Sequence, residues 1–260
     1  MKLAANLSLL FGELPLVERI GAAAAAGFAG VEIQFPYEVP ASELRSALDA
    51  AGLPLVLINL PAGDLMAGGA GLAAVPQRQA EFAAALDEAL AYAAVARPQC
   101  VNVLPGRLAA GVTREAALAT LAGNLRRAAA AFAPLGIRVL SEAINPLDMP
   151  GFLVNTPDDL LALLAAVDHP NFAAQLDFYH MARQGLDLPA CIAALAGRIG
   201  HVQFADCPGR GAPGSGTLDF AAALAALRAA GYAGWLAAEY RSDAAGTAAG
   251  LGWLADWRSR

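Results

Sequence analysis

The sequence predicts an α/β protein folded as a single (β/α)8 TIM barrel that spans residues 1–260. Short apolar runs typical of strands alternate with longer helical patterns along the whole chain, and this alternation indicates a parallel sheet. Eight strand–helix pairs in 260 residues match the usual size of such a barrel. No linker and no change in composition divides the chain, so we expect one domain.

The predicted strands are short runs rich in Val, Leu, Ile and Ala. They cover Leu3–Leu9, Gly30–Phe35, Pro54–Leu60, Cys100–Leu104, Arg138–Ile144, Ala173–Phe178, His201–Ala205 and Trp235–Tyr240. A doubly wound open sheet is the alternative arrangement. It would normally carry a glycine-rich phosphate-binding turn after the first strand, and "NLSLLFGELP" contains none, so the barrel is favoured.

The predicted helices end and begin at recognisable capping residues. "AAGF", "DAAGLP" and "RAAGYAG" each place a glycine just past a helix, where a left-handed residue is needed. Thr156 and Pro157 resemble an N-cap followed by a first helical proline. The predicted helices cover Leu16–Ala26, Ser42–Ala51, Gln77–Ala96, Arg114–Ala133, Thr156–Val167, Leu188–Arg198, Asp219–Ala230 and Ala245–Trp257.

The composition excludes several classes of protein. Hydrophobic residues make up 57% of the chain, which allows a large core, and a formal charge of −6 argues against a nucleic-acid partner. Cys100, Cys191 and Cys207 form no CxxC pair, so neither a disulfide framework nor a zinc knuckle is indicated. We find no signal peptide and no uninterrupted apolar stretch of the roughly 20 residues that span a membrane. We therefore expect a soluble cytoplasmic protein without a membrane partner, and the sequence leaves open whether it forms a homo-oligomer.

Oxygen-bearing side chains recur near the carboxyl ends of the last four predicted strands, where enzymes with this fold carry their chemistry. They are Glu142 in "LSEAIN", Asp177 in "AQLDFYH", Gln203 in "HVQFADC" and Glu239 in "LAAEY". Any one of them alone is explained by a cap or a salt bridge. Together at one barrel mouth they would repel one another and lose hydration unless a cation bound there. Oxygen ligands without cysteine favour Mg²⁺ or Mn²⁺.

Such a site would suit a substrate with adjacent carbonyl and hydroxyl oxygens. A cation could polarise the carbonyl and stabilise an enediolate, while Glu142 and Glu239 move a proton between neighbouring carbons. His180 is either a hydrogen-bond donor to a substrate oxygen or one half of a packed aromatic pair with Tyr179. Arg210 is either a clamp for a substrate carboxylate or an exposed loop residue. His201 is expected at the opposite end of the barrel, without a role.

Several segments carry a resemblance to a known family. The chain resembles the hydroxypyruvate isomerase family of xylose isomerase-like TIM barrels, in register along nearly its whole length. The segments are "ANLSLLFGE", "FPYE", "NLPAGD", "SEAIN…DMPGF", "LDFYHMAR", "GHVQFADCPGRGAPGSG" and "GWLAAEY".

The resemblance implies the interconversion of hydroxypyruvate and 2-hydroxy-3-oxopropanoate (tartronate semialdehyde), without phosphate on the substrate. It implies Glu142 and Glu239 as the acid–base pair, and it adds Asp177 and Gln203 to them as the metal ligands. His180 and Arg210 match the substrate-contacting positions of the family. Related epimerases tend to have His where this chain has Gln203, which favours an isomerase. One departure is Arg107 in "LPGR", where the family pattern leads us to expect Lys.

Other functions remain open at this stage. A 2-oxo-tetronate isomerase or a ketose 3-epimerase would use the same scaffold, and the walls formed by Phe11, Phe35 and the "DLMAGG" loop would decide substrate length. A metal-dependent phosphodiesterase or AP endonuclease would require more than three histidines and a basic face. A non-catalytic sugar-acid binding protein would have little use for two glutamates aimed at one cation.

Overall fold

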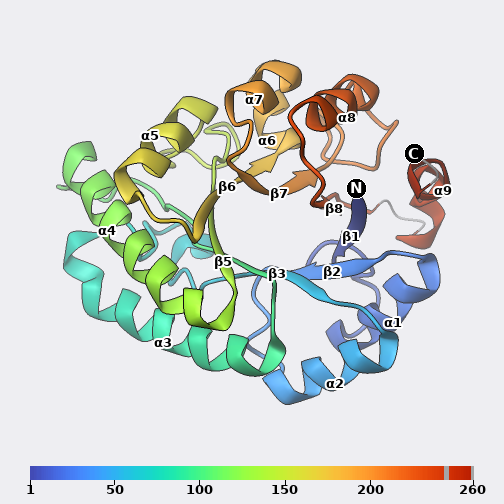
Figure 1. Ribbon diagram of the computed structural model, residues 1–260, viewed down its shortest axis with the longest axis horizontal. Helices are drawn as coiled ribbons and strands as arrows, with labels where there is room; N and C mark the ends of the chain where they lie inside the picture. The colour runs from blue at the N-terminus through green and yellow to red at the C-terminus, as the bar shows by residue number, and fades with distance from the viewer. Residues whose placement is uncertain (243–245, 259–260) are drawn as a thin grey trace.

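A closed barrel of eight parallel strands forms the centre of the molecule, in a computed structural model that describes residues 1–242 and 246–258. The strands follow one another around the barrel in chain order, and β8 closes it by pairing with β1. The helices form a ring outside the strands (Figure 1). The predicted (β/α)8 barrel is confirmed.

Every predicted strand is present, and all eight end one to three residues earlier than the sequence suggests. Glu142 and Asp177 are the last residues of their strands, and Glu239 lies one residue beyond its strand. The strands are β1 (Lys2–Asn6), β2 (Gly30–Ile33), β3 (Leu55–Asn59), β4 (Cys100–Asn102), β5 (Arg138–Glu142), β6 (Phe172–Asp177), β7 (Ile199–Phe204) and β8 (Trp235–Ala238).

The helices agree with the predictions except near β6 and at the carboxyl end. They are α1 (Leu16–Ala26), α2 (Ala41–Ala51), α3 (Gln79–Ala96), α4 (Arg114–Phe132), α5 (Pro157–Val167), α6 (Phe178–Arg183), α7 (Leu188–Ala194), α8 (Phe220–Ala229) and α9 (Gly252–Arg258). Gly27 and Gly52 end α1 and α2 with φ of 94° and 67°, and Thr156 forms a capping box with Asp159.

Three helix predictions need correction. The sequence does not reveal α6, because it begins directly after β6 and the Asp177 side chain caps it by accepting a hydrogen bond from the Tyr179 amide. The helix predicted to reach Arg198 stops at Ala194. The last helix begins at Gly252 after a short 3-10 turn, and Ala245, its predicted start, lies outside the described residues.

Side chains inside the barrel change from apolar to polar toward the carboxyl ends of the strands. An apolar cluster fills the amino-terminal half, with Trp235 packed against it; it consists of Ala4, Val56, Leu57, Cys100, Leu140, Ala173 and Ala237. Two residues beyond Leu140 and Ala173 come Glu142 and Gln175, which are both buried. Because side chains alternate along a strand, each of these pairs shares the inward face. The same alternation therefore supplies both the floor of the barrel and its polar mouth.

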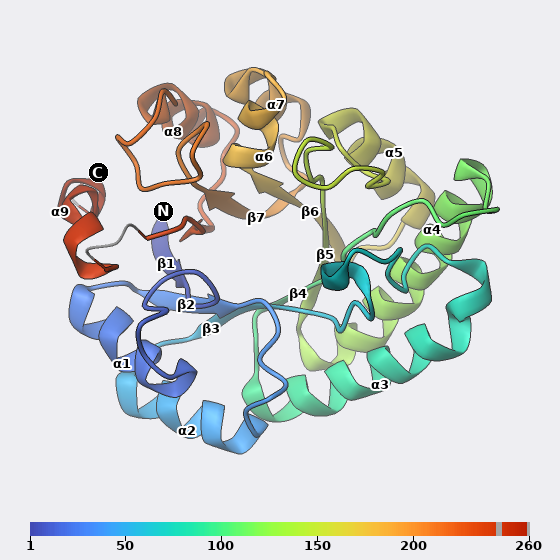
Figure 2. The ribbon, with the colours of Figure 1, turned by 180° about the vertical axis from the view of Figure 1, so that it is seen from behind.

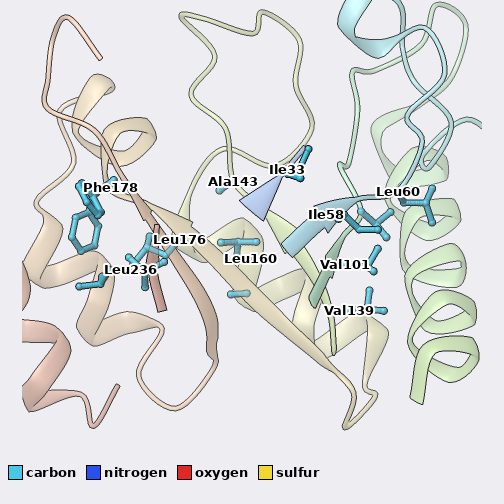
Figure 3. Packing of buried hydrophobic residues seen from close by; sticks show 14 of the residues in the cluster. Ile33, Ile58, Leu60, Val101, Val139, Ala143, Leu160, Leu176, Phe178 and Leu236 are labelled. Carbon is cyan, nitrogen blue, oxygen red and sulfur yellow. The ribbon is translucent and has the colours of Figure 1, made fainter. Parts of the chain in front are cut away.

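Residues at the intervening strand positions point outward and pack under the helices. Ile33, Ile58, Val139 and Leu176 belong to the large buried cluster between the strands and the helical ring, together with Leu160 of α5 (Figure 3). The bulk of the core therefore lies outside the barrel, and the interior is free to carry polar groups.

No helix within residues 1–242 and 246–258 is long and apolar enough to cross a membrane. Cys100, Cys191 and Cys207 are all buried and free. Seen from behind, loops that connect strands to helices lie around the centre of the ring (Figure 2).

Candidate active site

A cavity of about 440 Å³ opens where the strands end. Glu142, His180, Arg210 and Glu239 all line it, so four of the six predicted site residues face one cavity. Its apolar walls include Phe35, Leu65, Leu104, Ile144 and Met149. This agrees with the walls expected from Phe35 and the "DLMAGG" loop, whereas Phe11 is buried and is not among the described residues that line the cavity.

Glu142 ends β5 with its two carboxylate oxygens in different surroundings. Oε2 accepts hydrogen bonds from Gln175 Nε2 at 3.0 Å and from Asn102 Nδ2 at 3.4 Å. Oε1 lies 3.8 Å from Nε2 of His180. Burial, followed by the nearby charges of Glu239 and Asp177, raises the pKa of Glu142 well above its ordinary value. One oxygen is therefore held by amides and the other is free for chemistry.

Glu239 lies one residue beyond β8 and is paired with Arg210. Its Oε1 accepts hydrogen bonds from Arg210 Nη2 at 2.6 Å and from Gln34 Nε2 at 3.1 Å. Burial raises the pKa of Glu239 to about 8, against the opposing charge of Arg210. Two buried glutamates with raised pKa values therefore face the same cavity in different electrostatic surroundings.

Asp177 has one satisfied and one unsatisfied oxygen. Oδ1 accepts the hydrogen bond from the Tyr179 amide at 2.8 Å, whereas the buried Oδ2 has no hydrogen-bond partner. Oδ2 lies 3.6 Å from His180 Nε2 and 3.7 Å from Arg210 Nη2. Within the described part of the chain, Glu142, Asp177 and His180 each place a ligand atom within 4.8 Å of the others. An orphaned carboxylate oxygen among buried carboxylates is a setting that fits a divalent cation.

The hydrogen bonds of Asn145 determine which nitrogen of His180 carries the proton. Asn145 Oδ1 accepts from the Asp148 amide, and its Nδ2 donates to the Asp148 carboxylate at 3.2 Å. The same Nδ2 lies 2.7 Å from His180 Nδ1, which must then accept. The proton of the neutral ring is therefore on Nε2, which faces Glu142 and Asp177. Burial lowers the pKa of His180 to about 4, so the ring is a neutral donor near pH 7.

Of the two interpretations of His180, the packed pair with Tyr179 is confirmed, and the role as a donor to a substrate oxygen stays a prediction. Its ring packs edge-on against Tyr179 with centroids 5.4 Å apart, and its Nε2 still faces the cavity. The exposed interpretation of Arg210 is wrong, because only 18% of its side chain is accessible and its guanidinium stacks over Tyr179. Arg107 lines the cavity but donates to the carbonyls of Leu65 and Gly69, which ties two loops together.

Asp206 organises the loop that carries Arg210. Its carboxylate accepts hydrogen bonds from four backbone amides, those of Cys207, Gly214, Gly216 and Leu218. Arg210 itself has a φ of 55°, a left-handed conformation that is uncommon for a non-glycine residue. The fixed loop therefore holds the guanidinium in place against Glu239.

Gln203 and Asp177 are the two predicted site residues that are not among the described residues lining the cavity. Gln203 Nε2 donates to Glu32 Oε1 at 2.7 Å, and Gln203 Oε1 accepts from Gln175 Nε2 at 2.6 Å. Its assignment as a metal ligand stays a prediction. The expectation for His201 is wrong: it is fully buried in β7, two residues before Gln203, and its Nε2 lies 2.6 Å from Glu32 Oε2.

The sequence reasoning gave no role to Gln175, Asn145 or Glu32, which orient the predicted site residues. A signal for Gln175 was present, since it lies two residues before Asp177 on the same strand face. Asn145 follows β5 as a strand-ending residue, and only its contacts reveal its function.

Residues 20–257 match the sequence pattern of the xylose isomerase-like TIM barrel family. The chain belongs to this family. The 2-oxo-tetronate isomerase of Cupriavidus necator is 41% identical over 100% of this chain and 99% of its own length. The hydroxypyruvate isomerase of Escherichia coli K12 is 38% identical over 99% of this chain and 100% of its own length.

Solved structures of this xylose isomerase-like family agree with the fold. A crystal structure described as an AP endonuclease, family 2, from Brucella melitensis superposes with a TM-score of 0.94, at 38% identity, over 98% of both chains. The relatives from Cupriavidus necator and Escherichia coli confirm the resemblance to the hydroxypyruvate isomerase family and the prediction of an isomerase. The substrate named for the first has four carbons, and the substrate named for the second has three.

Proposed function

We propose that the protein interconverts hydroxypyruvate and 2-hydroxy-3-oxopropanoate by moving a proton between neighbouring carbons. The observation that carries this proposal is the pair of buried glutamates, Glu142 and Glu239, which face one cavity with raised pKa values. A carboxyl group whose pKa lies near the working pH can both take up and release a proton. The full-length relatives named as isomerases support the same reaction class.

The residues proposed to hold a divalent cation, Mg²⁺ or Mn²⁺, are Glu142, Asp177, Gln203 and Glu239. The unsatisfied Asp177 Oδ2 is the strongest support, because a buried carboxylate oxygen without a hydrogen bond is costly. When bound, such a cation supplies positive charge that polarises a substrate carbonyl and offsets the crowded carboxylates.

The chain's own residues perform the proton transfer. One glutamate removes a proton from C3 of hydroxypyruvate; the C–H electron pair becomes the C2–C3 double bond, and the carbonyl pair moves onto O2. The other glutamate then delivers a proton to C2, and the electron pair of the C2–C3 double bond forms the new C2–H bond. O3 loses its proton, and the O3–H electron pair forms the carbonyl of the aldehyde at C3. O2 gains a proton and becomes the hydroxyl group. His180 Nε2–H is placed to donate to a substrate oxygen, and the two glutamates exchange roles in the reverse direction.

Arginines line the cavity where the substrate carboxylate would bind. Arg210 is already engaged by Glu239, and Arg107 by backbone carbonyls. Arg183 lies 3.6 Å from Asp148 without a closer carboxylate partner among the described residues, and the exposed Arg241 lines the same cavity. We assign Arg183 and Arg241 to the carboxylate of the substrate, with Arg210 holding Glu239.

A 2-oxo-tetronate isomerase is the second candidate, favoured by the relative at 41% identity. The experiment that decides is an isomerisation assay that compares hydroxypyruvate with four-carbon 2-oxo acids, with and without Mg²⁺ or Mn²⁺. We expect turnover of hydroxypyruvate, and a higher kcat/KM for a four-carbon acid would support the second candidate instead. Absence of isomerisation with both substrates under all metal conditions would overturn the proposal.

A further inference from the structure

We infer that Glu32 is a positioning residue that fixes the side-chain amide of Gln203, with its carbonyl oxygen directed to the side of the barrel where Glu142 lies. The inference deepens the proposed function, because it concerns a residue assigned there to the cation. Among the described residues, Glu32 does not line the cavity, and its hydrogen bond to the proposed cation ligands is the one to Gln203. Its charge also contributes to the raised pKa values of Glu142 and Glu239.

Glu32 is fully buried and is surrounded by nitrogen donors. Asn6 Nδ2 and Gln203 Nε2 both lie 2.7 Å from Oε1, and His201 Nε2 lies 2.6 Å from Oε2. A carboxylate bonded in this way only accepts hydrogen bonds. Whatever faces it must therefore present an N–H group.

This requirement leaves Gln203 a single orientation. With Nε2 directed at Glu32, Oε1 accepts from Gln175 Nε2 at 2.6 Å. The flipped amide would set its oxygen against the carboxylate of Glu32 and its N–H groups against those of Gln175. Two buried repulsive contacts would replace two hydrogen bonds, so the flip is excluded as long as Glu32 is a carboxylate.

The same chain of hydrogen bonds reaches the proposed acid–base pair. Gln175 Nε2 donates to Gln203 Oε1 and also to Glu142 Oε2 at 3.0 Å. The orientation imposed by Glu32 is therefore passed to a carboxylate oxygen of Glu142, and Gln175 is the connecting residue. The order Glu32, Gln203, Gln175, Glu142 joins four strands, β2, β7, β6 and β5, inside the barrel.

The test is the variant Glu32→Gln, in which an amide at position 32 can also donate and Gln203 can flip. We expect Mn²⁺ affinity, measured by calorimetry, and kcat each to fall by about 10- to 100-fold, with KM changed less than threefold. The ¹⁵N-detected side-chain amide signals of Gln203 in the metal-free protein, assigned by their absence in Gln203→Glu, should shift. This readout does not depend on turnover, so it tests the inference even if the proposed reaction is wrong.

Asn6→Ser provides the matched control, because Asn6 donates to the same carboxylate and, within the described part of the chain, forms no hydrogen bond with Gln203. It should lower thermal stability and leave Mn²⁺ affinity and kcat within about twofold. If Glu32→Gln does not fold, the double variant Glu32→Gln/Gln203→Glu is used instead. It exchanges the two side chains, so an amide at position 32 can donate to a carboxylate at position 203, and it should bind Mn²⁺ at least as tightly as the natural protein. The inference is overturned if folded Glu32→Gln keeps the Gln203 amide signals and Mn²⁺ affinity, or if the folded exchange variant loses Mn²⁺ binding.

Discussion

Arg210 and Glu239 form a charge-assisted hydrogen bond at the mouth of the barrel, with Nη2 of the guanidinium 2.6 Å from Oε1 of the carboxylate. The same guanidinium lies 3.7 Å from Asp177 Oδ2. Burial lowers the pKa of Arg210, but the surrounding carboxylates outweigh this effect and raise it above its ordinary value. The arginine therefore stabilises negative charge on one side of the site, while Glu142 on the other side is contacted by neutral amides.

Replacing either glutamate by glutamine should remove most of the activity. Glu142→Gln and Glu239→Gln each keep the shape of the side chain but cannot take up a proton, so kcat should fall by about 100- to 10,000-fold. Circular dichroism should show an intact fold, and the exposed Glu115→Gln should behave as the natural protein. Full turnover in either variant would refute the acid–base assignment.

Arg183→Gln and Arg241→Gln should raise KM for hydroxypyruvate by roughly tenfold each, because each removes one cation facing the substrate carboxylate. The effect on kcat should be smaller, since these side chains do not contact the proposed acid–base pair in the structure. Steady-state kinetics would separate the two parameters. Arg198→Gln, an exposed arginine just before β7, is the control for loss of charge, and an equal KM in all variants contradicts the assignment.

Removal of divalent cations should abolish turnover and lower the melting temperature. Without a cation, ionisation of the buried Glu142 and Glu239 is unfavourable, as their raised pKa values indicate, and Asp177 Oδ2 stays unsatisfied. Exhaustive chelation followed by addition of Mg²⁺ or Mn²⁺ should restore both quantities in an activity assay and a thermal melt. Full activity after chelation would show that the cation has no catalytic role.

The metal-free protein should lose stability as pH rises from 7 to 8. Glu239 has a folded-state pKa raised to about 8, against an ordinary value of 4.5, so the folded form retains a proton that the unfolded form has already lost. The contribution of Glu239 to the free energy of unfolding is therefore largest below the pKa of the unfolded form and is lost as the pH rises through the pKa of the folded form. Between pH 7 and pH 8 the loss amounts to up to about 1 kcal/mol.

His180 has only a small opposing effect in this interval, because its folded ring is neutral with a pKa lowered to about 4, and its unfolded ring, with an ordinary pKa of 6.5, is already mostly neutral at pH 7. Urea unfolding at pH 7 and pH 8 measures the change, and Glu239→Gln should flatten it. Stability that rises between these pH values would contradict the direction of the shift.

Asp206→Ala should impair the site through the loop it organises. Four backbone amides would lose their acceptor, and the loop would no longer hold Arg210 against Glu239. We expect kcat/KM to fall by about 10- to 100-fold, because small displacements of a positioned group are costly. Asp206→Asn keeps one acceptor oxygen, so its kcat/KM should lie between those of the natural protein and Asp206→Ala. Unchanged kinetics in Asp206→Ala would show that the loop does not need this residue.

Local patterns in the sequence were sufficient for most of the fold. Helix ends at Gly27, Gly52 and Thr156 follow from capping, which depends on neighbouring residues alone. The helix after β6 could not be predicted in the same way. Its residues follow the strand without a break, and what starts it is the side chain of Asp177 turning back onto the Tyr179 amide.

Strand alternation and the common carboxyl end of a parallel barrel can be read from the sequence, and they predict that Glu142, Asp177, Gln203 and Glu239 gather near the barrel mouth. In the structure Glu142 and Glu239 line the cavity, whereas Asp177 and Gln203 are not among the described residues that line it. Which atom contacts which depends on the closed barrel as a whole. Gln203 bonds to Glu32, 171 residues earlier in the chain, and His180 takes its tautomer from Asn145. These pairings depend on the stagger of the strands around the closed barrel, which sets the heights at which inward side chains face one another and which no local stretch of sequence encodes.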